Sequence, residues 1–291
     1  MRKTHIAAAA AGVVLMTGLT ACGSDDGGSS GDKSGDKSAS KGGGSPVQGA
    51  LAALQKASTA TEKQQSAKTE TQQTQVLNGR TLKTENKGAF DWSSGGIRGT
   101  VTATMKGGTG APMDFEVRYL ADGMYIKTGG AGGGAKWAKS SYDELGDGGP
   151  SGAMLKDQLQ NNNPARSVQT LLASRKVEAV GSETVRGTKT THYTGTLTLS
   201  ELVKMQSKDL KESDRKALER QFEQAGMKSE KIDLWIDGDD LLIKKKESSQ
   251  GSKTSMNNVT YYSDYGTDVD LTPPPASQVE ESKGKARPGL G

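Results

Sequence analysis

The chain has 291 residues with a net charge of only +4, and its 38 basic and 34 acidic residues are interspersed. This pattern argues against the basic stripe of a nucleic-acid-binding protein. A single cysteine excludes an internal disulfide, and hydrophobic residues at 32% with aromatic residues at 4% predict a thin core.

Residues 1–22 have the three parts of an export signal. Arg2 and Lys3 supply positive charge, and residues 6–18 form an Ala-rich apolar stretch. As a helix this stretch would span about 20 Å, which is less than the ~30 Å hydrocarbon core of a bilayer. We therefore expect the segment to be removed rather than retained as a transmembrane helix.

The apolar stretch ends at Leu19-Thr20-Ala21-Cys22. This order resembles the lipobox of bacterial lipoproteins, in which Leu, a small residue and Ala or Gly precede a Cys. The resemblance implies that residues 1–21 are a lipoprotein signal peptide and that Cys22 carries diacylglycerol, to which an N-acyl chain can be added. Two acyl chains anchor a protein stably, so we expect a lipid-anchored protein of the cell membrane that faces outside the cytoplasm. The alternative is a conventional cleavage after Ala21, with Cys22 as an incidental thiol.

Residues 22–46 begin with the lipidated Cys22 and continue with Gly, Ser, Asp and Lys. Ala39 is the only aliphatic residue before Pro46. Such a stretch cannot bury enough apolar surface to offset its ordering entropy. We interpret it as a disordered linker that holds the domain about 25–30 Å from its anchor. We expect one folded domain over residues 47–275 and a second disordered segment over residues 276–291.

Apolar residues recur every three to four positions after Pro46, which predicts a first helix as far as about Ala60. From Ala67 the period changes to two, and turn signals predict consecutive antiparallel hairpins with one apolar face and one face of Thr, Lys and Glu. These turn signals are Asn78-Gly79, residues 93–96, Gly107-Gly108 and Asp122-Gly123.

Helical patterns then cover residues 153–159 and the segment after Pro164. Strands are predicted to resume at residues 176–185 and 188–199. A polar helix at about residues 213–225 follows and ends at Gly226. The last strands are predicted at residues 232–236, 241–247 and 257–265.

Four segments are similar to actinobacterial lipoproteins of the LppX and LprG type, which are relatives in shape of the carriers LolA and LolB. They are residues 119–127 followed by Lys136-Trp137, residues 190–195, residues 234–237 and residues 262–266. The resemblance implies an α+β fold, a strongly curved antiparallel β-sheet or half-open barrel with helices covering its concave face. It also implies an apolar cavity between the layers, in which members of the family hold acyl chains or lipidated molecules and move them through the envelope.

An acyl chain is held by apolar contact and needs no particular polar residue. Each candidate for the inward, cavity-lining face could instead be an ordinary core residue in contact with its neighbours. The candidates are Met105, Met113, Phe115, Val117, Tyr119, Leu234 and Ile236.

Enzyme hypotheses find little support in the sequence. His192 has no second ligand at metal-binding spacing, and residues 237–240 lack the pattern of an EF-hand loop. The glycine run 129–134 lacks the ending of a phosphate-binding loop. We therefore expect no catalytic residue, no metal and no cofactor beyond the lipid on Cys22.

Two functions remain open. The first is a monomeric carrier lipoprotein that binds a hydrophobic or lipidated ligand and meets an envelope transporter or acceptor protein. The second is a non-enzymatic cell-envelope interaction protein with the same fold and a filled core.

Overall fold

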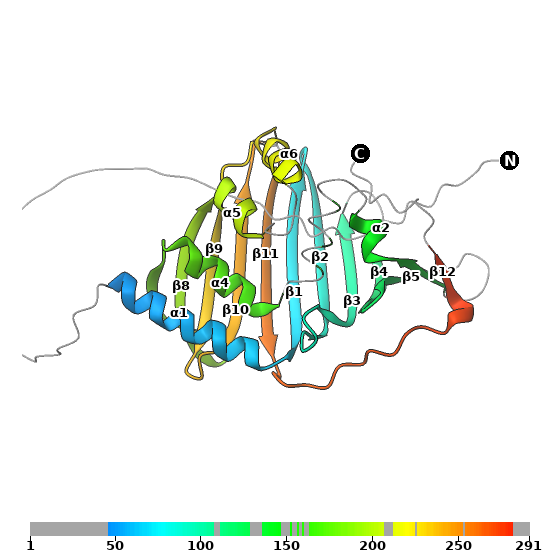
Figure 1. The fold of residues 1–291 in the computed structure, drawn as a ribbon, viewed down its shortest axis with the longest axis horizontal. Helices are drawn as coiled ribbons and strands as arrows, with labels where there is room; N and C mark the ends of the chain where they lie inside the picture. The colour runs from blue at the N-terminus through cyan, green and yellow to red at the C-terminus, as the bar shows by residue number, and fades with distance from the viewer. Residues whose placement is uncertain are drawn as a thin grey trace, which may run out of the picture.

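A computed structural model describes residues 46–107, 111–128, 136–146, 163–206, 212–224, 226–252 and 254–281, with positions 152, 156 and 159. Its described strands form one open sheet of 12, in the order β12-β6-β5-β4-β3-β2-β1-β11-β10-β9-β8-β7. Helices lie against one side of this sheet (Figure 1). The predicted α+β fold, a curved antiparallel sheet with helices on one face, is confirmed.

Most elements agree with the sequence patterns, but no helix was predicted at residues 142–146 or 199–206 and no strand at residues 279–281. The helices are α1 (Pro46–Lys63), α2 (Tyr142–Gly146), α4 (Pro164–Ser174), α5 (Leu199–Gln206), α6 (Glu212–Gln224) and the 3-10 turn η1 (Ala276–Gln278). The strands are β1 (Ser66–Leu77), β2 (Arg80–Asp91), β3 (Arg98–Gly107), β4 (Met113–Leu120), β5 (Gly123–Thr128), β6 (Lys136–Ser140), β7 (Glu178–Val185), β8 (Thr188–Thr198), β9 (Ser229–Asp237), β10 (Leu242–Gln250), β11 (Thr254–Ser263) and β12 (Val279–Glu281).

The sheet consists of two meanders joined in the middle. Strands β1 to β6 pair in chain order, strands β7 to β11 do the same, and β1 pairs with β11. At this junction the hydroxyls of Thr71 and Thr260 lie 3.0 Å apart. The predicted turn at Asn78-Gly79 has φ of 49° and 78°, and two positive values are what a type I′ hairpin turn requires.

The main core lies between α1, α4 and strands β8 to β10. Leu54 of α1 and Leu171 of α4 are fully buried and belong to one cluster with Tyr193, Leu234 and other side chains of the sheet. We call the side of the sheet that carries Leu234 the helix face and the opposite side the outer face. Because side chains alternate along a strand, the registers assign every paired residue to one of these faces.

The C-terminal segment corrects one prediction. Residues 276–291 were expected to be disordered from their start, yet β12 pairs in parallel with β6. On the outer face, Val279 and Leu271 pack against a buried cluster of Leu120, Tyr125 and Trp137. The boundary of the folded part therefore lies at residue 281 or later, because this apolar cluster and the edge of β6 give the tail a surface to pair with.

A second correction concerns the middle of the helix face. The predicted pattern of one apolar and one polar face holds on β3, where Val101, Ala103 and Met105 are buried. On β1, β10 and β11 the buried positions of the helix face include Gln73, Glu247 and Asn258. The helix face therefore has apolar residues towards both edges of the sheet and buried polar residues on the strands between them.

Several predictions fall outside the described residues. They concern the signal peptide, Cys22, the linker as far as residue 45, the run 129–134 and most of the helix predicted at 153–159. In the part of the chain that is described, no helix combines the length and the apolar character needed to cross a bilayer.

Candidate functional site

The strand registers place all seven predicted cavity residues on the helix face. Val117 pairs with Val101, which is linked through β2 and β1 to the core residue Tyr262. The same face carries the residues that lie an even number of positions from Val101 on β3 or from Val117 on β4, namely Met105, Met113, Phe115 and Tyr119. On β9, Leu234 and Ile236 lie on the same side because Leu234 pairs with Tyr193 of the core.

These residues do not form one group. Leu234 and Ile236 belong to the cluster packed under α1 and α4, so they are core residues at this position. Met105 and Val117 are buried on the far part of the same face. Met113 lies on the same face at the start of β4 with 47% of its surface exposed, so it lies outside the buried part of that face.

Strands β3, β4 and β5 carry a patch that we call the apolar strip. It consists of Val101, Ala103, Met105, Phe115, Val117 and Ile126, which share the helix face through the pairings of the three strands. The described helices α1, α4 and α5 make their main contacts with strands β7 to β10. The strip is therefore separated from Tyr262, the nearest core residue along the pairings, by the width of β1 and β2.

A polar cluster on β10 and β11, absent from the predicted site, occupies the space between these apolar regions. Lys245 Nζ donates to Ser167 Oγ and to Glu247 Oε1, each at 3.0 Å. The other carboxylate oxygen of Glu247 accepts from Asn258 Nδ2 at 3.1 Å. Burial by itself lowers the pKa of Lys245, but the adjacent carboxylate of Glu247 more than offsets this and raises it.

Glu230 of β9 completes this cluster. It pairs with Leu197 of the core and is fully buried on the helix face. Burial raises the pKa of its carboxyl well above the usual value, and the negative charge of Glu247 raises it further, while Lys245 acts in the opposite direction. Neither carboxyl oxygen of Glu230 has a hydrogen-bond partner among the described residues. Burial therefore favours the protonated form of this carboxyl.

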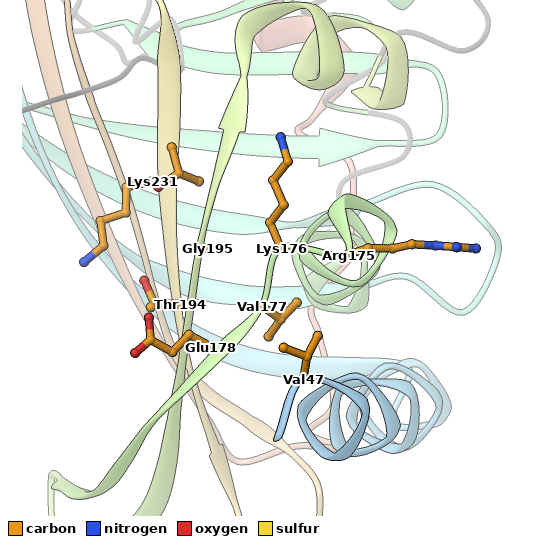
Figure 2. A pocket seen from close by; sticks show the side chains of 9 residues that line it. Val47, Arg175, Lys176, Val177, Glu178, Thr194, Gly195 and Lys231 are labelled. Carbon is orange, nitrogen blue, oxygen red and sulfur yellow. The ribbon is translucent and has the colours of Figure 1, made fainter. Parts of the chain in front are cut away.

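A groove of about 410 Å³ lies at the sheet edge, where β7 begins. It is lined by Val47, residues 175–178, residues 194–196 and Lys231, and none of the seven predicted cavity residues contributes to it. Figure 2 shows the side chains of Val47 and Val177 side by side, whereas Arg175 points away from β8. Lys176 and Lys231 already have carboxylate partners, Glu201 and Asp233, so we assign no ligand to this groove.

His192 lies on the outer face within a network of side chains. Its two ring nitrogens are 2.9 Å from Glu183 Oε1 and from Asp233 Oδ1. The ring stacks on Trp235 at 4.3 Å, and Asp233 also accepts from the hydroxyl of Thr194 at 2.7 Å. Both ring nitrogens of His192 are therefore engaged by carboxylates of the outer face.

No group of three or more His, Cys, Asp or Glu residues with metal-binding geometry occurs within the described ranges. Residues 237–240 form a hairpin turn, in which Asp237 Oδ1 accepts from the amides of Asp239 and Leu241 at 3.0 and 2.8 Å. Asp237 Oδ1 is therefore used within the turn that joins β9 to β10.

Comparison with known proteins returns two relatives along most of the chain, whereas no family model matches it. A protein of Streptomyces griseus described as an uncharacterized 31.2 kDa protein is 37% identical over 229 residues, which cover 72% of this chain and 74% of the relative. A protein of Streptomyces coelicolor described as a "putative lipoprotein" is 35% identical over 243 residues, which cover 79% of this chain and 74% of the relative.

Solved structures with a similar chain path include two mycobacterial proteins, LprF and the lipoprotein LppX. LprF from Mycobacterium bovis has a TM-score of 0.48 and 16% identity, covering 79% of this chain and 99% of that chain. LppX from Mycobacterium tuberculosis has a TM-score of 0.47 and 17% identity, covering 77% and 99%. The relative described as a "putative lipoprotein" agrees with the lipoprotein class that the sequence predicted.

Proposed function

The chain belongs to a family of Streptomyces lipoproteins, and from this premise we propose that it is a lipid-anchored carrier on the outer side of the cell membrane. It binds a hydrophobic or lipidated ligand between the helix face of its sheet and the segments that cover it. Cys22 bears the diacylglyceryl anchor, and residues 23–45 serve as the spacer. No catalytic step is part of this function.

The apolar strip is the observation that carries the proposal. Val101, Ala103, Met105 and Val117 are each at most 6% exposed, yet they lie beyond the strands on which α1, α4 and α5 mainly pack. Contact with apolar side chains of this kind holds an acyl chain at ~25 cal/mol for each Å² of the acyl chain's own surface that is removed from water. Met105, Phe115, Val117 and Tyr119 are therefore the predicted lining residues that we retain.

The second candidate function is an interaction protein with a filled core. The packing of the helix face on β9 favours it. Leu234 and Ile236 pack directly with α1 and α4 side chains in the main core cluster. If the apolar strip were filled in the same way, the protein would present only its loops and outer face to partners.

Extraction of non-covalently bound lipid separates the two functions. Full-length protein is purified from membranes, extracted with organic solvent and examined by mass spectrometry. We expect a bound apolar molecule in the wild type and its loss in Val117→Trp, because the larger ring fills the strip. Val259→Trp is the matched control, since Val259 lies on the outer face of β11. A wild type without bound lipid would favour the filled core.

A further inference from the structure

Three buried side chains on the helix face have oxygen atoms without partners. Glu230, Ser249 and Asn258 are 0%, 3% and 8% exposed. Both carboxyl oxygens of Glu230, Oγ of Ser249 and Oδ1 of Asn258 lack a hydrogen-bond partner among the described residues. Each buried polar group left in this state costs about 1–3 kcal/mol, so a folded protein retains such a group for a reason.

These atoms belong to one cluster around Glu247. Asn258 donates its Nδ2 hydrogen to Glu247 Oε2. Ser249 follows Glu247 by two positions on β10 and therefore shares its face. The carboxyl of Glu230 interacts electrostatically with Glu247 and with Lys245. The unpaired oxygens thus lie in one region of the sheet, between β9 and β11.

Both nitrogens of the cluster donate to its own oxygens, while four of its oxygen atoms have no partner among the described residues. Lys245 donates to Ser167 and Glu247, and the amide nitrogen of Asn258 donates to Glu247. All four unpaired atoms are oxygens. A ligand group that only accepts, such as an ether or ester, can pair with the hydroxyl hydrogens of Ser249 and of protonated Glu230, but it leaves Asn258 Oδ1 unpaired. A carboxylate would in addition place a negative charge beside Glu247.

The cluster lies in one row with the apolar strip. Asn258 pairs with Gln73, Gln73 with Thr84, and Thr84 with Met105. Neighbouring strands are about 4.8 Å apart, so Asn258 and Met105 are separated by roughly 14 Å across the sheet. An alkyl chain that lies on the strip can therefore bring its end group to the cluster.

We propose that Glu230, Ser249 and Asn258 form a polar subsite that receives a hydrogen-bond-donating end group, a hydroxyl or an amine, of a ligand whose alkyl chain lies on the apolar strip. This inference rests on the proposed carrier function and names the chemistry of its ligand. A hydroxyl can accept from the neutral Glu230 and donate to Asn258. An ammonium can donate to all three side chains, and it requires Glu230 to release its proton.

The test compares three probes of one chain length, 1-decanol, decylamine and 1-methoxydecane. Full-length protein in lipid nanodiscs is loaded with a fluorescent acyl probe, and its displacement is measured. On the wild type we expect the alcohol or the amine to displace the probe at about tenfold lower concentration than the ether, which corresponds to about one buried hydrogen bond.

Variants locate the effect. Asn258→Leu and the milder Ser249→Ala should bring the preferred probe to the level of the ether. Asn257→Leu, the adjacent exposed position on the outer face, should behave as the wild type. A preference for decylamine that disappears in Glu230→Gln identifies an amine site, whereas a preference for 1-decanol that survives in it identifies a hydroxyl site.

The experiment distinguishes a wrong carrier function from a wrong polar subsite. If the protein takes up no acyl probe, the carrier function is wrong. If it takes up the probe and all three decyl compounds compete equally, the carrier function stands and the polar subsite is wrong, because the cluster then holds only water.

Discussion

Lys245 Nζ and Glu247 Oε1 lie 3.0 Å apart on the helix face of β10, and each side chain is only 8% exposed. A buried ion pair loses far more when one partner is removed than when both are replaced, since the remaining charge has no counter-ion. The stability of the sheet and the polarity of its helix face therefore depend on the same two residues.

The first prediction removes the cation of this pair. Lys245→Met should lower the free energy of unfolding by about 3–5 kcal/mol, and the double variant Lys245→Met/Glu247→Leu should recover most of this loss. Urea unfolding of the full-length protein measures both values. Lys246→Met, on the outer face, is the control. A single variant as stable as this control would show that the pair is solvated.

The second prediction concerns the pH dependence caused by Glu230. Its folded pKa is raised, mainly by burial, so above the unfolded value of about 4.3 the folded state keeps a proton that the unfolded state releases. Stability due to this group is therefore complete at low pH and is lost as pH rises towards the folded pKa. Glu230→Gln cannot ionise, so its stability relative to the wild type should increase as the pH rises above about 4. Parallel stability curves would show that Glu230 is not buried as an acid.

The third prediction tests the outer-face network. His192→Ala removes a ring that contacts Glu183 and Asp233 and stacks on Trp235. We expect a loss of about 1–3 kcal/mol, because the side chain of Asp233 is buried and loses one of its partners. Thr196→Ala, on the same face of β8, should change stability by less than about 0.5 kcal/mol. Lipid uptake should be unchanged in both variants, and a selective loss of uptake in His192→Ala would place the ligand on the outer face instead.

The hairpins were largely predictable from the sequence because their signals are local. Asn78-Gly79 and Asp122-Gly123 mark turns that the structure contains, and the first helix begins at Pro46 as its spacing predicts. The β1–β11 pairing, with Thr71 opposite Thr260, was not predictable. Nothing near either strand along the chain specifies so distant a partner.

The polar cluster was missed for a related reason. Leu242 faces the helices through its pairing with Ile236, and Lys245 faces the same side three residues later. Strict alternation counted from Leu242 would place Lys245 and Glu247 on the outer face, where charged residues are ordinary. The departure from alternation within β10 is visible only in three dimensions, as is the parallel pairing of β12 with β6.

The fourth prediction concerns the lipid anchor. In cells supplied with labelled palmitate, the wild type should incorporate the label and fractionate with membranes. Cys22→Ala should abolish labelling, because the thiol is the atom that accepts the diacylglyceryl group in a lipobox and the chain has no other cysteine. Labelling that persists in the variant would disprove the lipobox interpretation, and membrane retention without label would indicate an uncleaved signal.

The position of the ligand tests the central claim most directly. Full-length protein is irradiated with a fatty alcohol that carries a diazirine in its alkyl chain, and the labelled peptides are mapped by mass spectrometry. We predict label on the segments that contain Val101, Met105 and Val117, reduced by Val117→Trp and unaffected by Val259→Trp. Label confined to outer-face positions, or no label above a competitor control, would contradict binding on the apolar strip.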